Sequence, residues 1–521
     1  MKRMYARASQ WMLFMGMLFI GCVCLTACSD DNPTPADKPE QGEQKEPESD
    51  ENSMDPVEPV VTEADYTVLF YAHGGKNLDD GIVENIGQFY NAQPESFKKV
   101  KAAVQYQFSQ DLSEGAEKLE SMGVPCNAVA GKAYRFAVDG DLTLKDQFVA
   151  ANELDKQGVP FASGESLKAF YEWGVQHLPA KKYVLVISDH GYGFAPHDDL
   201  PTTISRGILY DDSDSDRHFT AFLLDEVLGQ LSVKPEVLYF DACLMNMMEI
   251  HYQLKEHCPY IIASSFIVPG HGGSYDTLVD LLADGKRGIE DKLTAYCNTC
   301  VDQWTAIEGS SDYHDMAVVR TSGLTAYAAQ LKTFTDKLVD IYDKDATAKT
   351  AIDQETEEAY KVFLDTPYYD IDYTENIAKA LPQVFGDLYD GLKAAYEGCI
   401  VQQRSSPILE NDDEQVDMTV LLGVNGTYSV YTWADESDEN AISYVERYHW
   451  DGTVDSYLTA QTTDEQGLTY LQVAAAPFEQ ATWGATGEQT YAILKFDQAV
   501  GWSRWLKANQ HEPNWYSDSR M

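Results

Sequence analysis

The sequence predicts an α/β fold in which helices cover a mostly parallel β-sheet. Three short apolar runs, at 66–71, 183–187 and 237–240, have the length and composition of strands that are buried on both faces. Segments with apolar residues at helical spacing lie between these runs. Strands that alternate with helices of this length indicate parallel pairing, with the helices packed on both faces of the sheet.

The elements of the first half follow from local signals in chain order. The run YTVLFY is β-branched and aromatic, and VKAAVQYQF alternates as a strand does. Ser163-Gly164-Glu165-Ser166 opens a helix that ends near Pro179. We expect strands at 66–71, 100–108, 133–138, 183–187, 237–240 and 260–264, and helices at 78–90, 163–179, 219–231 and 245–255.

The pattern changes in the second half, where helices and strands no longer alternate regularly. We expect helices at 278–282, 293–307, 324–342 and 352–364, and strands at 317–322, 417–433 and 469–474. Gly309-Ser310-Ser311 offers a flexible seam between the halves. We therefore expect a catalytic domain at 65–310 and a C-terminal α+β region at 311–521.

Residues 1–28 have the features of an export signal. Lys2, Arg3 and Arg7 precede an apolar stretch at 11–23 that is short for a membrane span, and Leu25-Thr26-Ala27-Cys28 follows. This end resembles the lipobox of bacterial lipoproteins, which implies a lipid anchor, palmitate included, on Cys28. The alternative is a plain secretory signal.

The acidic residues after Cys28 indicate where the protein is exported and how it is tethered. Ser29-Asp30-Asp31-Asn32 resembles the signal that sends lipoproteins of Bacteroides-type bacteria to the outer face of the outer membrane. We therefore expect an outer membrane lipoprotein that faces the cell exterior. The stretch 29–64 is rich in Pro, Glu, Asp and Gln, so it predicts a disordered linker.

The charge balance excludes one class of partner. A formal net charge of −46 would repel nucleic-acid phosphates. An acidic surface instead suits solubility, cationic substrates or divalent ions. We expect a monomer whose partners are protein or peptide substrates and the membrane lipid.

A thiol and an imidazole are expected to meet at one edge of the sheet. Cys243 follows the strand at 237–240, and His190 follows the strand at 183–187. The interval between them suits one helical crossover between parallel strands, so both side chains should lie at the same strand ends. A buried structural cysteine is the alternative for a lone thiol, but a nearby base favours a nucleophile. The backbone N–H of Gly191 and that of Cys243 could hold an oxyanion.

At these residues the sequence resembles the clostripain-like cysteine peptidases of the caspase/gingipain/legumain clan. The matching segments are YTVLFYAHGGKNLDD, ESLKAFYEWGVQHLPAKKYVLVISDHGYGF, RGILYDDSDSD, VLYFDACLMNMMEIHYQL and IIASSFIVPG. The resemblance implies a caspase-like α/β/α sandwich, with Cys243 as the nucleophile and His190 as the general base or orienting acid.

The resemblance also implies a pocket for basic side chains. An acid two residues before the cysteine lines this pocket in the family, and here that residue is Asp241. The family adds a second acid near the Pro-Gly turn, where this chain has His271 and Gly272, so Asp276 is the candidate replacement. The alternative for Asp241 is a structural acid that caps the next helix. His73 is expected to be structural.

No cofactor is required for this chemistry, and calcium is one candidate. Oxygen ligands gather in the loop DDSDSD, at Asp211, Asp212, Asp214 and Asp216. The loop lacks the glycine and the closing glutamate of an EF-hand, so a solvated loop remains the alternative.

Together these features predict an endopeptidase that cleaves after Arg or Lys through a thioester acyl-enzyme at the bacterial surface. The alternative is a non-catalytic surface lipoprotein that uses the same fold to bind proteins or glycans.

Overall fold

A computed structural model of the chain describes the residues from which the fold is built. These are residues 63–138, 142–154, 160–191, 193, 208–209, 219–309, 314–362, 368–369, 371–407, 418, 420–421, 428–429, 444–448, 454–458, 460–463, 469–472 and 494–508.

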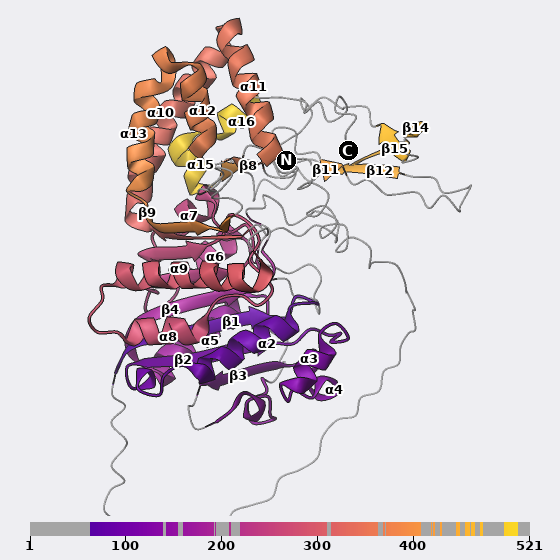
Figure 1. Cartoon of the computed structure of the whole chain (residues 1–521), viewed down its shortest axis with the longest axis vertical. Coiled ribbons are helices and arrows are strands. Elements are labelled where there is room, and N and C mark those ends of the chain that lie inside the picture. The colour runs from indigo at the N-terminus through magenta and orange to yellow at the C-terminus, as the bar shows by residue number, and fades with distance from the viewer. Residues whose placement is uncertain are drawn as a thin grey trace, which may run out of the picture. The chain divides into compact units, whose positions relative to one another are not determined.

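A central sheet of eight strands organises the described part of the chain (Figure 1). Its strand order is β3-β2-β1-β4-β5-β6-β7-β9. The four inner pairings, from β2 to β6, are parallel, while β3, β7 and β9 pair antiparallel. The prediction of a mostly parallel sheet is confirmed.

Of the eight strands of this sheet, all but β9 lie within a few residues of their predicted positions, and β9 was not predicted. They are β1 (Ala64–His73), β2 (Val100–Gln107), β3 (Ala133–Ala137), β4 (Ala180–Ser188), β5 (Val237–Asp241), β6 (Tyr260–Ala263), β7 (Asp315–Arg320) and β9 (Ile400–Ser405). The first strand begins earlier and ends later than its apolar core, because its pairing with β2 and β4 continues as far as His73 and Ala72.

Helices cover both faces of the sheet, as the alternating pattern predicts. One face is covered by α2 (Asp79–Gln88), α8 (Tyr275–Ala283) and α9 (Ile289–Glu308), and Figure 1 shows α8 and α9 in front of the strands. The other is covered by α5 (Gly164–His177), α6 (Ala221–Gly229) and α7 (Met248–Leu254). The caspase-like α/β/α sandwich is confirmed.

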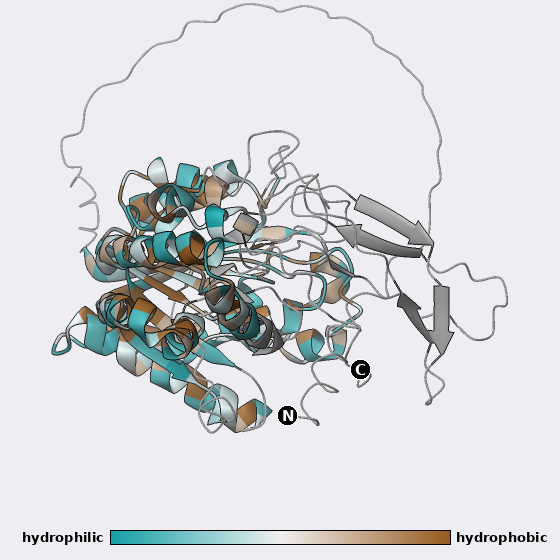
Figure 2. Ribbon diagram, turned by 90° about the horizontal axis from the view of Figure 1, so that it is seen from above, coloured by the Kyte–Doolittle hydropathy of each residue, from teal (hydrophilic) through white to brown (hydrophobic). Residues whose placement is uncertain are grey.

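The two faces carry separate hydrophobic cores because strand residues alternate. Val184 and Val186 of β4 pack into the core that contains α2, α8 and α9, whereas Leu185 and Ile187 pack into the opposite core. Successive strand side chains point to opposite faces, so a fully apolar strand is buried on both. The coloured helices of Figure 2 carry both hydrophobic and hydrophilic residues.

The helix after β5 begins later than predicted, at Met248 rather than Met245. The backbone N–H groups of Leu244 and Asn246 donate to the carbonyl groups of Phe266 and Ser264. These bonds tie residues 244–246 to the segment that follows β6, so the first turn of α7 begins only after them.

The remaining helices of the described chain include α3 (Ala116–Ser121), α4 (Cys126–Val129), α10 (Leu324–Tyr342), α11 (Ala346–Val362), α12 (Ile371–Ala380), α13 (Pro382–Glu397), α15 (Lys495–Val500) and α16 (Ser503–Ala508). The α10 bounds match the prediction, and α10, α12 and α13 gather beside the β9 edge in Figure 1. No helix among the described residues is both long and apolar enough to cross a membrane.

Short strands outside the central sheet complete the described elements. They are β8 (Tyr368–Tyr369), β10 (Val420–Leu421), β11 (Tyr428–Ser429), β12 (Tyr444–Tyr448), β13 (Val454–Leu458), β14 (Ala460–Thr463) and β15 (Thr469–Gln472). The division at residue 310 stays a prediction, and β7 and β9, which follow it, belong to the central sheet.

Truncation of the central strand β4 should destabilise the whole domain. Leu185 is fully buried, so Leu185→Ala removes apolar area and leaves a cavity. We expect a loss of about 2–5 kcal/mol in the free energy of unfolding, measured by urea denaturation. As a control, Val233→Ala at a position that is 39% exposed should change it by less than about 1 kcal/mol. An equal effect of the two variants would contradict the assignment of Leu185 to the core.

Candidate active site

The pairing of β4 with β5 brings His190 and Cys243 to the same edge of the sheet. Ser188 and Asp241 form the last residue pair of these parallel strands. The chain then continues two residues from each strand, to His190 and to Cys243. The juxtaposition predicted from the strand pattern is therefore present.

The backbone of Gly191 approaches the backbone of Cys243 closely. A Cβ atom at position 191 would lie 2.2 Å from the carbonyl oxygen of Cys243 and 2.9 Å from its nitrogen. Every side chain other than hydrogen would therefore displace the cysteine. This explains the glycine after the histidine, and it sets the two backbones that are predicted to supply the oxyanion donors side by side.

The His190 ring is held by the turn that follows β1. Its Nε2 atom lies 2.7 Å from Oδ1 of Asn77, an acceptor that orients the ring. A Cβ atom at Gly75 would lie 2.8 Å from Cδ2 of His190, so this glycine leaves room for the imidazole. Sequence reasoning missed Asn77, although its position just after the His-Gly-Gly turn at the end of β1 was a usable signal.

Burial keeps this imidazole neutral. It lowers the pKa of His190 to about 4, with a further lowering from nearby His73 and an opposing backbone hydrogen bond with Gly75. At neutral pH the ring is therefore unprotonated.

Cys243 differs from the other described cysteines in its exposure. All six are free thiols, and Cys243 is partly exposed while the other five are buried. Burial of the sulfur raises the pKa of Cys243 to about 11; the backbone N–H of Val268, whose nitrogen lies 3.3 Å from Sγ, acts against this rise. The resting pair is thus a protonated thiol beside a neutral imidazole, so attack requires proton transfer to a base.

Backbone strain gathers around these two residues. Within the described chain, the non-glycine residues with positive φ are Lys76 (80°), Leu209 (66°) and Leu244 (62°). Lys76 lies between Gly75 and Asn77, Leu244 follows Cys243, and the N–H of Leu209 donates to the carbonyl of His190. Such conformations cost about 1–3 kcal/mol each and cluster at functional sites.

Asp241 is the last residue of β5, two residues before Cys243, and its buried carboxylate accepts hydrogen bonds from three donors. Tyr275 Oη donates to Oδ2 over 2.6 Å, the Gly273 N–H donates to Oδ2 over 3.1 Å, and Tyr239 Oη donates to Oδ1 over 3.1 Å. Burial raises the pKa of Asp241, while these bonds act in the opposite direction. The acid does not cap α7, whose N-cap is Met247 without a side-chain bond.

His271 stands where the family resemblance implies a second acid. Its charged form would lower the pKa of Asp241, and its Nδ1 lies 3.2 Å from Oε1 of Glu308. Burial lowers the pKa of His271. Asp276 instead lies in the first turn of α8, where its Oδ1 accepts from Ser274 Oγ (2.9 Å). The bonds described for Asp276 thus hold the helix start and do not join it to Asp241.

His73 has the structural role that its position predicts. Its ring is fully buried, and Nδ1 accepts the N–H of Gly75 over 2.9 Å. The same atom lies 3.7 Å from a carboxylate oxygen of Asp189.

The remaining candidate residues lie outside the described residues. These are Cys28 of the lipobox and Asp211, Asp212, Asp214 and Asp216 of the acidic loop. Among the described residues, no three His, Cys, Asp or Glu side chains are grouped to hold a metal ion. The lipid anchor and calcium therefore stay predictions.

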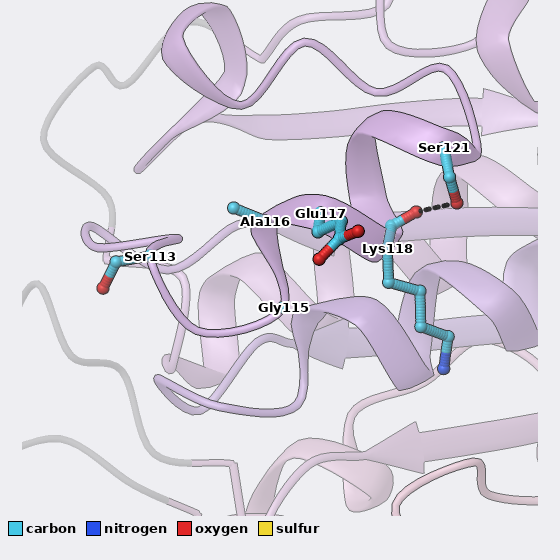
Figure 3. A pocket seen from close by; sticks show the side chains of 6 residues that line it. All are labelled: Ser113, Gly115, Ala116, Glu117, Lys118 and Ser121. Carbon is cyan, nitrogen blue, oxygen red and sulfur yellow. Dashed lines mark hydrogen bonds between the residues drawn. The ribbon is translucent and has the colours of Figure 1, made fainter.

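A surface hollow lies apart from this chemistry. It is lined by Ser113, Gly115, Ala116, Glu117, Lys118 and Ser121, where Ser121 Oγ donates to the Lys118 carbonyl (Figure 3). Lys118 pairs with Asp80 and Glu84 of α2. The lining contains neither histidine nor cysteine.

The raised pKa of Cys243 predicts slow alkylation of the resting protein. Iodoacetamide should modify Cys243 about tenfold faster for each pH unit between pH 7 and 9, because the thiolate is the reacting form. Mass spectrometry of the labelled peptide measures this rate. His190→Ala should keep the same shape of profile, since the histidine holds no thiol proton at rest. A plateau already present at pH 6 would contradict the neutral pair.

The sequence matches known proteins of one family. The sequence model of the clostripain family matches residues 106–465. Clostripain of Hathewaya histolytica is 26% identical over 268 residues, which are 47% of this chain and 49% of that protein. The chain thus spans about half the length of this relative.

A solved structure shows the same fold at low sequence identity. A secreted C11 cysteine protease from Bacteroides thetaiotaomicron, in complex with an irreversible peptide inhibitor, has a TM-score of 0.50 at 16% identity, over 84% of this chain and 99% of that one. A second structure of a secreted C11 protease from this organism, named iotapain, has a TM-score of 0.48 at 16% identity, over 66% and 87% of the two chains. The family match covers more than half of the sequence, and the chain therefore belongs to the clostripain family of cysteine peptidases.

Proposed function

We propose that this protein is a cysteine endopeptidase that cleaves after basic residues with a dyad of His190 and Cys243. The observation that carries the proposal is the meeting of these residues beyond the last β4–β5 pair, in a chain of the clostripain family. The peptide inhibitor bound to the related Bacteroides protease supports peptides as the substrate class.

The reaction begins from the neutral pair. Sγ of Cys243 transfers its proton to His190 as it attacks the scissile carbonyl, and the Val268 N–H supports the developing thiolate. The N–H groups of Gly191 and Cys243 receive the oxyanion of the tetrahedral intermediate. His190 then protonates the leaving amine as the C–N bond breaks, which leaves a thioester. Water, deprotonated by His190, breaks the thioester and regenerates the thiol.

Asp241 is the proposed determinant of the basic preference. It is the nearest acid before the nucleophile, and burial makes its carboxylate sensitive to an arriving cation. The Gly272 backbone lies against it, since a Cβ there would be 2.6 Å from Oδ2. The acidic surface adds a general attraction for cationic peptides.

The proposed activity predicts a sharp loss on removal of the thiol. Cys243→Ala should lower hydrolysis of Arg- and Lys-terminated reporter amides by at least about 10³-fold, since covalent attack is lost. Cys126→Ala, which removes a buried thiol elsewhere, is the matched control and should retain activity. Parallel assays with calcium and with a chelator test whether the activity depends on calcium. Equal inertness of wild type and variant in every condition would favour the binding-module alternative.

The specificity proposal separates the two acids. Asp241→Asn should lower kcat/KM for Arg and Lys reporters by more than about tenfold, because the pocket loses its charge. Asp276→Asn should have little effect, because the bonds of Asp276 lie at the start of α8. A profile of cleaved bonds across a peptide library measures both. A loss confined to Asp276→Asn would assign the preference to that acid instead.

We also propose that Cys28 carries the lipid anchor and that the protein faces the cell exterior. The support is the signal-like sequence at 1–28 with its acidic continuation. Bacteria grown with a palmitate analogue should label the wild-type protein but not Cys28→Ser. Protease added to intact cells should degrade the anchored protein. Labelling of the variant, or protection from the added protease, would contradict the respective part.

A further inference from the structure

The segment 264–268, between β6 and α8, holds the turn that carries the nucleophile. The Val268 N–H donates to Sγ of Cys243, the Leu244 N–H donates to the Phe266 carbonyl (3.0 Å), and the Asn246 N–H donates to the Ser264 carbonyl (2.9 Å). The sulfur and the strained residue after it therefore keep their positions only if this segment keeps its own.

One buried carboxylate organises that segment. Oδ1 of Asp315 accepts from Ser264 Oγ (2.6 Å) and from the Phe266 N–H (2.8 Å), and Oδ2 accepts from the Ser265 N–H (3.0 Å). Asp315 is fully buried. A carboxylate that accepts several bonds in a buried site binds its donors more strongly than a neutral group does.

The direction of β7 explains how a residue so far along the sequence reaches the site. β7 pairs antiparallel with β6, and Ala263 lies opposite Ala317. An antiparallel strand begins where its partner ends, so Asp315, the first residue of β7, lies at the edge where β4 and β5 deliver His190 and Cys243. Asp315 also lies beyond the predicted boundary at residue 310.

We propose that Asp315 is a positioning residue of the peptidase: it holds segment 264–268, which in turn holds the Cys243 sulfur and its turn for attack. The proposal rests on the proposed function of His190 and Cys243. Asp315 has no described hydrogen bond to the sulfur, although its charge raises the pKa of the Cys243 thiol; its positioning effect passes through the segment that carries the Val268 N–H and the Phe266 carbonyl.

The surroundings of Asp315 bear on its protonation. Its interactions within the described chain are with the Ser264, Ser265 and Phe266 donors. The titratable groups around it are the thiols of Cys243 and Cys297, its chain neighbour His314, and Arg404, which lies opposite Met316 on β9.

Burial raises the pKa of Asp315 to about 6, against the pull of its hydrogen bonds. Above pH 6 the carboxylate accepts all three bonds. Protonation as the pH falls through 6 places a proton on one oxygen, which can then no longer accept from its donor.

The test compares Asp315→Asn with wild type in the full chain. Asparagine keeps the shape, but its amide nitrogen cannot accept. We expect kcat on an Arg reporter amide to fall about 10–100-fold with KM changed less than about threefold, because small misplacements of reacting groups carry costs of that size. The wild-type acid limb near pH 6 should be absent in the variant, which leaves only the limb near pH 4 from His190.

Hydrogen–deuterium exchange and a control variant test the positioning role of Asp315 separately from activity. Hydrogen–deuterium exchange should be faster across 264–268 in Asp315→Asn, even if no reporter is cleaved, which separates this inference from the proposed activity. Asp225→Asn is the matched control: Asp225 accepts from His257, Gln253 and Lys495 away from the sheet edge, so kcat and exchange at 264–268 should not change.

A milder variant provides a second test in case Asp315→Asn does not fold. Ser264→Ala removes one of the three bonds and should lower kcat about 2–10-fold, since a hydrogen bond to a charged group contributes about 1.5–3 kcal/mol before relaxation. A folded Asp315→Asn with wild-type kcat and an unchanged limb near pH 6 would overturn the proposal. Unchanged exchange across 264–268 would do the same.

Discussion

The parallel pairing of β4 with β5 is the constraint on which the rest of the site depends. Parallel strands end at the same edge, so two residues beyond the Ser188–Asp241 pair the chain presents an imidazole and a thiol together. Both strands are buried on both faces, with alternate side chains in two separate cores. The edge is therefore rigid, and it can support strained turns that an isolated loop would relax.

Chain segments from three further places complete the edge. Asn77, in the turn after β1, contacts the ring of His190. Val268, in the segment after β6, donates its N–H to the sulfur of Cys243. Asp315, at the start of β7, accepts hydrogen bonds from that segment. The close approach of Gly191 to Cys243 then leaves no room for adjustment. The positions of His190 and Cys243 thus depend on contacts from both the backbone and the side chains of these other segments.

Burial decides the resting electrostatics of the site. It lowers the pKa of His190 and raises that of Cys243, so both side chains are uncharged at neutral pH. Burial also raises the pKa of Asp241, although three hydrogen-bond donors to its carboxylate act against this rise. His271, whose Nδ1 lies 3.2 Å from Oε1 of Glu308, occupies the turn at which the family resemblance implies a second acid.

Local periodicity and the geometry of parallel strands were enough to predict the α/β/α class, the strands of the central sheet other than β9, and the shared sheet edge of His190, Gly191 and Cys243. The start of α7, the hydrogen bonds of Asp241, the separation of Asp276 from it, and the contacts of Asn77 and Asp315 could not be predicted in this way. Those features depend on contacts between segments far apart in sequence, such as the antiparallel return of β7 onto β6. No local pattern encodes such a contact, because the hydrogen bonds of Asp315 exist only once the sheet has formed.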